Sequence, residues 1–84
     1  MDQFKIEYNV EAQRDLRKLS PEVARRITQK INRLANGLSG DVKRLVKFKP
    51  DYRLRVGDWR VLFEIDGKTI VIHHVSHRST AYDG

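Results

Sequence analysis

The 84-residue chain contains no cysteine, and none of its apolar runs is long. The lack of cysteine excludes a disulfide scaffold, thiol catalysis and cysteine-ligated zinc, and it fits a reducing cytoplasm. No apolar run approaches the roughly 18–20 residues that a membrane-spanning helix needs. The first residues do not show a basic segment followed by an apolar one, as a signal peptide would. We therefore expect a cytoplasmic protein with no membrane partner.

Metal-ligand patterns are also scarce. His73 and His74 are consecutive and point to opposite faces of any strand, and no acidic cluster accompanies them. We expect neither a metal nor another cofactor. The length allows one domain, residues 1–84, with a thin core. Hydrophobic residues at 39% and charged residues at 33% indicate a folded chain rather than a disordered one.

Positive charge is what the chain has in excess. Its 17 Lys and Arg against 11 Asp and Glu give a formal net charge of +6. Most of this excess lies in residues 42–60, whose acidic residues are Asp51 and Asp58 alone. Such a concentration favours a polyanionic partner such as nucleic acid, and a solvated basic surface is the alternative. The cations of this segment are Lys43, Arg44, Lys47, Lys49, Arg53, Arg55 and Arg60.

The first half of the chain has the pattern of one strand and two helices. Apolar residues alternate over residues 4–8, which predicts a half-buried strand. Asn9 is a suitable N-cap for a first helix, and Ser20 followed by Pro21 for a second. Gly37 and Gly40 can end the second helix. The expected inner faces of the two helices are Ala12, Leu16 and Leu19, then Val23, Ile27, Ile31, Leu34 and Leu38.

From about residue 43 the apolar period changes to two. Three strands are expected, over residues 52–56, 59–65 and 69–75, with turn signals at Gly57-Asp58 and Asp66-Gly67. The predicted fold is of the α+β class, in the order strand–helix–helix–strand–strand–strand. Its small, mostly antiparallel sheet carries both helices on one face.

Strand alternation predicts where the arginines lie. If Leu54 and Val61 face the helices, then Arg53, Arg55 and Arg60 share the open face. For the last strand, either Ile70 and Ile72 or Val71 and Val75 could be inward. Like charges on adjacent strands repel each other, so a sheet that gathers arginines favours an anionic ligand over an idle surface.

Phosphate is the anion that best matches arginine, whose planar fork donates two parallel hydrogen bonds. RNA carries its own nucleophile, the 2′-hydroxyl, so a protein cleaves it by orienting that group and transferring protons. His77 is one candidate for proton transfer, because imidazole titrates near neutral pH. For His73 and His74 a structural role in the sheet is the plainer interpretation, and Trp59 is expected in the core.

Two stretches resemble a known family. Residues 51–65 resemble the YRLRVGDYRVLYEI signature of RelE/ParE-superfamily toxins, and residues 77–82 resemble their terminal HR-x-x-x-Y motif. The element order and the basic lead-in over residues 43–49 also match. The resemblance implies a RelE-like fold and the toxin component of a type II toxin–antitoxin system. In the RelE-like branch it implies a ribosome-dependent, metal-independent endoribonuclease that cleaves mRNA in the A site and inhibits translation.

The same resemblance suggests roles for individual residues. Tyr82 would be the general base for the 2′-hydroxyl, with His77 as a competing base or acid. Arg60 and Arg78 would stabilise the phosphate in the transition state, and Arg53 or Arg55 would act at the leaving oxygen or orient the backbone. The general acid stays open, because an arginine does not give up its proton. The expected RNA- or ribosome-binding residues are Lys43, Arg44, Lys47 and Lys49.

The implied partners are a cognate antitoxin protein, mRNA and the ribosome. Operator DNA would be bound only through the toxin–antitoxin complex, and the free toxin is expected to be monomeric. Two alternatives stay open. The ParE-like branch inhibits DNA gyrase on the same fold, and the arginine face could also serve a non-catalytic nucleic-acid-binding module.

Overall fold

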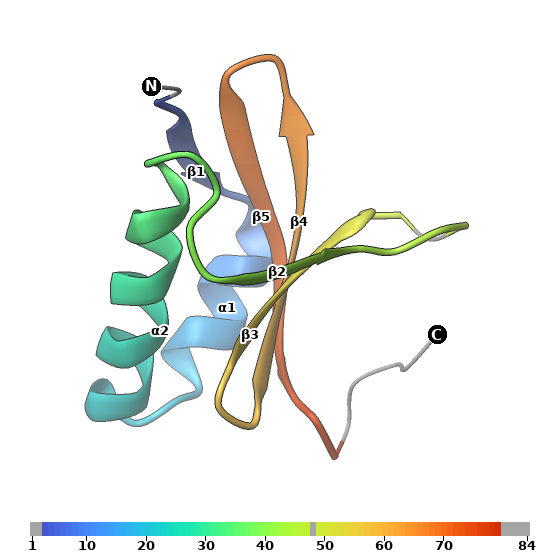
Figure 1. Cartoon of the computed structure of the whole chain (residues 1–84). Helices are drawn as coiled ribbons and strands as arrows, with labels where there is room; N and C mark the ends of the chain where they lie inside the picture. Colours follow the sequence, from blue (N-terminus) through green and yellow to red (C-terminus); the bar gives the residue numbers. More distant parts are fainter. Residues whose placement is uncertain (1–2, 48, 80–84) are drawn as a thin grey trace.

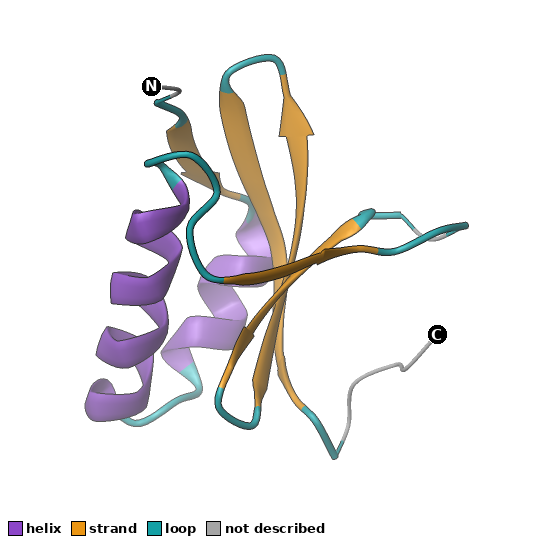
Figure 2. Ribbon diagram, in the orientation of Figure 1, coloured by secondary structure: helices purple, strands orange, loops and turns teal. Residues whose placement is uncertain are grey.

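A computed structural model describes residues 3–47 and 49–79. In these ranges the chain forms two helices that cover one face of a five-stranded sheet (Figure 1 and Figure 2). The strand order across the sheet is β1-β5-β4-β3-β2. Only the β1–β5 pair is parallel, so the expected α+β class and mostly antiparallel sheet are confirmed. The elements are β1 Lys5–Tyr8, α1 Val10–Arg17, α2 Pro21–Leu34, β2 Asp41–Arg44, β3 Tyr52–Val56, β4 Trp59–Asp66 and β5 Thr69–His77.

Both helices begin at the caps that the sequence predicts. The Asn9 side chain accepts a hydrogen bond from the Ala12 N–H at 2.9 Å, and Ser20 Oγ accepts one from the Val23 N–H at 3.4 Å. Each cap provides a partner for a backbone donor that has none within the first helical turn. Neither helix of the described ranges is long and apolar enough to cross a bilayer.

The core lies between the helices and one face of the sheet. Ile27, Ile31 and Leu34 of α2 are fully buried, as the predicted stripe requires. They meet the inward side chains of β3, β4 and β5, whose neighbours along each strand are more exposed. This alternation confirms the predicted direction of β3 and β4. The inward side chains are Leu54, Val56, Val61, Phe63, Ile70, Ile72 and Val75.

A register shift resolves the direction of β5. Phe63 pairs with Ile72, whereas the preceding residue Leu62 pairs with His74, so β5 has one extra residue at His73. Such a bulge reverses the alternation of side chains. Ile72 is therefore inward before the bulge, and Val75 is inward after it. Each of the two alternatives that the sequence left open therefore holds on one side of the bulge: Ile70 and Ile72 are inward before it, and Val75 is inward after it.

Three details differ from the predicted boundaries. The structure has one more strand than expected, β2, which pairs with β3 at the edge of the sheet. Helix α2 ends at Leu34, earlier than the glycines suggest, and Leu38 follows in a left-handed conformation with φ 61° while still packing on the core. The second turn is centred on Gly67 and Lys68, because Asp66 pairs with Thr69 as the last rung of the β4–β5 ladder.

Candidate functional site

The turn between β3 and β4 sets the geometry of the site. Gly57 has φ 60° and Asp58 is not left-handed, which is the pattern of a type II′ hairpin turn. This tight turn fixes the register, so that Val56 pairs with Trp59 and Arg55 lies directly opposite Arg60. Two guanidinium groups are thereby placed side by side on the face of the sheet away from the helices.

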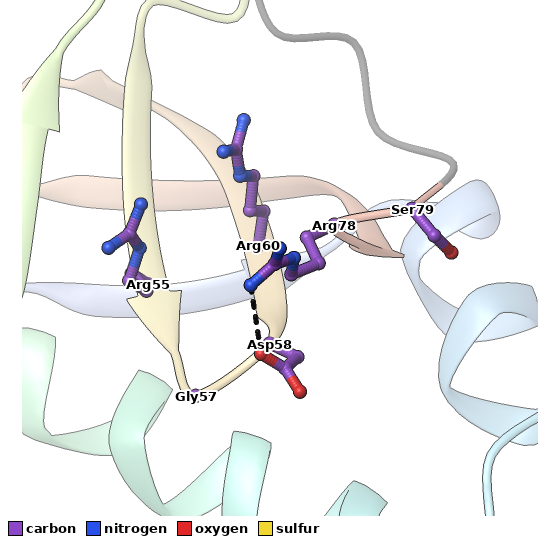
Figure 3. Close-up of a pocket in the computed structure, with 6 residues that line it drawn as sticks. All are labelled: Arg55, Gly57, Asp58, Arg60, Arg78 and Ser79. Atoms are coloured by element: carbon purple, nitrogen blue, oxygen red, sulfur yellow. Dashed lines mark ion pairs between the residues drawn. The ribbon is translucent and has the colours of Figure 1, made fainter.

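A hollow of about 610 Å³ opens beside this turn (Figure 3). Arg55 contributes to it from β3, Arg60 from β4, and Arg78 from the segment that follows β5. Figure 3 shows the Arg55 and Arg60 side chains extending in the same direction, with Arg78 beside them. Three of the arginines expected in the site are thus brought together from distant parts of the sequence. The described lining residues are Arg55, Gly57, Asp58, Arg60, Arg78 and Ser79.

Asp58 holds Arg78 at two points. The Arg78 N–H donates to the Asp58 carbonyl oxygen at 2.8 Å, and Arg78 Nη1 lies 3.7 Å from Asp58 Oδ1. The second contact is the dashed line in Figure 3. Sequence reasoning treated Asp58 only as a turn residue, and only its position between Arg55 and Arg60 could have pointed to the pocket.

Arg53 behaves differently from Arg55, although both lie on the open face of β3. Its side chain is only 11% exposed, and its Nη2 lies 3.7 Å from Asp41 Oδ1 on β2. Its buried Nε has no hydrogen-bond partner within the described part of the chain. Arg53 does not line the hollow. Arg53 is therefore packed into the sheet surface beside β2, outside the hollow.

His77 and Arg78 are neighbours in sequence but face opposite sides of the sheet. The His77 ring meets the Trp59 ring edge-on, with ring centroids 5.0 Å apart. Trp59 packs against the core, so His77 lies on the helix side. Its Nδ1 accepts the Ser79 N–H at 3.2 Å and lies 2.8 Å from Ser79 Oγ. Because a backbone N–H always donates, the ring proton of neutral His77 is assigned to Nε2.

The other two histidines form polar contacts within the fold, as their structural interpretation predicts. His73 Nε2 lies 2.9 Å from Glu64 Oε1, and its Nδ1 lies 3.3 Å from Asn9 Nδ2. His74 lies between two carboxylates of α1, at 3.8 Å from Glu11 and 3.7 Å from Asp15. These contacts connect the bulge of β5 to the first helix.

The expected RNA-contact residues lie outside the hollow. Lys43 and Arg44 are on the edge strand β2, and Lys47 and Lys49 are in the loop that follows it. All four are exposed, and Arg44 Nε lies 3.6 Å from Asp51 Oδ2. In Figure 1 this loop projects away from the helices. Tyr82, the expected general base, is outside the described residues.

Two further observations concern titratable groups. Burial raises the pKa of the Tyr8 phenol above its ordinary value. Tyr8 lines a second hollow of about 580 Å³, bordered also by residues of α1 and α2, which shares no described lining residue with the first. Among the residues that the structure describes, no three His, Asp or Glu side chains gather as a metal site would require.

Known proteins are similar to this chain in sequence and in architecture. A family model described as the ParE toxin of the type II toxin–antitoxin system parDE matches residues 6–82. Toxin RelE3 of Methanocaldococcus jannaschii is 40% identical over 48 residues, which cover 57% of this chain and 54% of that protein. The matched part thus spans about half the length of this curated relative.

Two solved structures are similar over nearly their whole length. One is a RelB–RelE antitoxin–toxin complex from Methanococcus jannaschii, with TM-score 0.73, 27% identity, and coverage of 88% of this chain and 92% of that chain. The other is the toxin–antitoxin complex RelBE2 from Mycobacterium tuberculosis, with TM-score 0.71, 26% identity, and coverage of 90% and 99%.

The arginine-lined fold is that of the RelE/ParE superfamily of toxins. The chain belongs to the family of ParE toxins of type II toxin–antitoxin systems, with RelE-like relatives in sequence and structure. The resemblance drawn from residues 51–65 and 77–82 is confirmed.

Proposed function

We propose that this toxin is a ribosome-dependent, metal-independent endoribonuclease that cleaves mRNA in the A site and so inhibits translation. The observation that carries the proposal is the convergence of Arg55, Arg60 and Arg78 on one hollow at the open face of the sheet. Three cations in one hollow repel each other, and an anionic ligand relieves that repulsion. A phosphodiester matches the forked geometry of the guanidinium groups.

The proposed reaction is an in-line displacement at phosphorus by RNA's own 2′-oxygen. The general base takes the proton of the 2′-hydroxyl as the O2′–P bond forms, and O5′ takes a proton from an acid in the site or from water as the P–O5′ bond breaks. The products are a 2′,3′-cyclic phosphate and a 5′-hydroxyl. Arg60 and Arg78 stabilise the negative charge that develops on the phosphate oxygens, and Arg55 orients the backbone. Each guanidinium stays charged throughout, so the arginines stabilise charge and do not transfer protons.

Proton transfer falls to other groups. Tyr82, which matches the terminal tyrosine of the family motif, is proposed as the general base, since a cation beside a phenol favours the phenolate form. His77 is the competing candidate. Its ring lies on the helix side against Trp59, and its Nδ1 already accepts from Ser79, so a role for it requires a rearrangement near the end of β5. Arg53, which contacts Asp41 and does not line the hollow, is proposed to support β3 beside the arginines of the site.

The proposed partners follow from the same surface and from the relatives. We propose a cognate antitoxin protein, since the similar structures are antitoxin–toxin complexes. The ribosome and its mRNA would be contacted by Lys43, Arg44, Lys47 and Lys49. Operator DNA would be bound only through the antitoxin complex. The free toxin is proposed to be a cytoplasmic monomer of one domain, residues 1–84.

The test is to map mRNA 5′ ends in a translating extract with and without the toxin. The proposal expects new 5′ ends inside open reading frames, and none on the same mRNA without ribosomes. Unchanged mRNA at a toxin concentration that stops translation in the extract would contradict it. A matched control removes two cations from the exposed side of α2, as Arg26→Ala with Lys30→Ala, and should still cleave.

A second candidate function is inhibition of DNA gyrase. A family model of ParE toxins matches residues 6–82, and this match favours the gyrase candidate because the ParE-like branch that the sequence resembles inhibits gyrase. A supercoiling assay with purified gyrase separates the two candidates. Loss of supercoiling with intact mRNA supports the gyrase candidate, and cleaved mRNA with normal supercoiling supports the ribonuclease.

A further inference from the structure

One carboxylate lies among the arginines of the hollow. Asp58 is the acidic residue of the described lining, together with Arg55, Arg60 and Arg78. A carboxylate at this place repels a phosphate and weakens its binding. We therefore looked for a favourable effect of the Asp58 carboxylate that offsets this loss of affinity.

The stability of the fold does not depend on a carboxylate at position 58. The turn depends on the positive φ of Gly57, and asparagine suits the position of Asp58 as well as aspartate does. The Asp58 and Arg78 side chains are 65% and 69% exposed. An ion pair this exposed adds little to stability, because water screens it.

The position of Arg78 gives a better reason. The β4–β5 ladder ends where Trp59 pairs with His77, so Arg78 lies just past the last rung. The Arg78 N–H continues the ladder by donating to the Asp58 carbonyl oxygen at 2.8 Å, and the Asp58 carboxylate then lies 3.7 Å from Nη1. One turn residue thus holds both the backbone and the guanidinium of Arg78 (Figure 3).

We propose that Asp58 is a positioning residue that aims the Arg78 guanidinium into the hollow. This inference rests on the proposed ribonuclease function. Asp58 does not touch the reacting atoms. It restricts Arg78 to the side of the hollow where Arg60 also reaches the phosphate, and its negative charge lowers the affinity for RNA.

The two effects of the carboxylate act on different kinetic constants. In Asp58→Asn the backbone carbonyl still accepts the Arg78 N–H, but the charge that orients the guanidinium is gone. The maximal cleavage rate, kcat, should fall about tenfold, because the misplaced Arg78 guanidinium no longer contacts the phosphate in the transition state. The half-saturating toxin concentration, KM, should fall about threefold, because one repulsive charge is removed. A change that only unfolds part of the protein has the opposite pattern, because it raises the half-saturating toxin concentration and leaves the maximal rate at saturating toxin unchanged.

The experiment measures single-turnover cleavage of mRNA on programmed ribosomes over a range of toxin concentrations. Asp66→Asn is the matched control, since it removes an exposed carboxylate at the opposite end of β4. The control should leave kcat unchanged. Asp58→Asn should add less than twofold to the kcat loss when Arg78→Ala is already present. An unchanged kcat in Asp58→Asn, or a full tenfold loss in the Arg78→Ala background, would overturn the positioning role.

A binding measurement separates this inference from the proposed function. If the wild-type toxin cleaves no mRNA, the ribonuclease proposal fails by itself. The affinity for a fluorescein-labelled single-stranded RNA oligonucleotide then tests the charge of Asp58 alone. Asp58→Asn should bind about threefold more tightly than the wild type. Equal tightening in Asp66→Asn would show a general charge effect and would overturn the assignment to the hollow.

Discussion

The two faces of the sheet differ in the side chains that they present, although they are built from the same strands. On the helix side, side chains such as Leu54, Val61 and Phe63 are excluded from water. On the open side, Arg55 and Arg60 lie between those positions and surround a hollow. Because neighbours in a strand point to opposite faces, β3 and β4 carry core residues and the arginines of the hollow at alternate positions. Substitutions on the two faces should therefore separate activity from stability.

The largest effect is expected on the open face. Replacing both Arg60 and Arg78 by alanine should lower mRNA cleavage about 10³-fold or more, since removal of one charge-stabilising donor alone costs about 10²–10³ in rate. Urea unfolding should show a free energy of unfolding within about 1 kcal/mol of wild type, because surface ion pairs contribute little. Full toxicity of this double variant in growing cells would contradict catalysis at this face.

The complementary substitution is on the helix face. Ile72 is fully buried in the core, so Ile72→Ala should lower the free energy of unfolding by about 2–5 kcal/mol through lost burial and the cavity that remains. Cleavage per folded molecule should stay near wild type, measured after correction for the folded fraction. A loss of activity larger than the loss of folded protein would mean that the two faces are coupled.

Arg53 and Arg55 lie on the same face of β3 but differ in exposure, so their substitution should have different effects. Arg55 is exposed and lines the hollow, whereas Arg53 is almost buried and paired with Asp41. Arg55→Ala should reduce the slope of log affinity against log salt for single-stranded RNA by about 0.7, the loss of one phosphate contact. Arg53→Ala should leave that slope unchanged and alter the unfolding midpoint instead. Equal salt slopes for both variants would contradict the division between them.

The smallest effect is expected far from both the hollow and the centre of the core. Asn9 caps α1 through the hydrogen bond from Ala12, and Asn9→Ala should destabilise the protein by about 1 kcal/mol. Thermal unfolding followed by circular dichroism measures this. Cleavage at a temperature where both proteins are folded should not change. Asn9→Asp is the matched variant, because aspartate also caps a helix and should retain the stability.

Much of the fold could be predicted, because its helix caps, helix stripe and strand alternation are visible in short stretches of the sequence. The caps at Asn9 and Ser20, the stripe on α2 and the alternation in β3 and β4 each require only neighbouring residues. Strand β2 was missed because Asp41–Arg44 has one apolar side chain, Val42, and is an edge strand. Such a strand depends on pairing with β3, which no local pattern reports.

The rest of the site depends on contacts between distant residues. The bulge at His73 decides which residues of β5 face the helices, and it appears only when β4 and β5 pair. It places His77 against Trp59, away from the arginines, where the sequence allowed either side. Alternation put Arg53 and Arg55 on the same face, but only the pairing with Asp41 shows that Arg53 is packed down.

The proposed function requires that the open face cleaves RNA by means of RNA's own 2′-hydroxyl. The direct test uses ribosomes programmed with an mRNA that has one 2′-deoxynucleotide at the mapped cut site, and mass spectrometry of the 3′ ends. We expect a 2′,3′-cyclic phosphate on the unmodified mRNA and no cleavage at the deoxy position. Cleavage of the deoxy mRNA at the same bond, or a 3′-hydroxyl product, would contradict it.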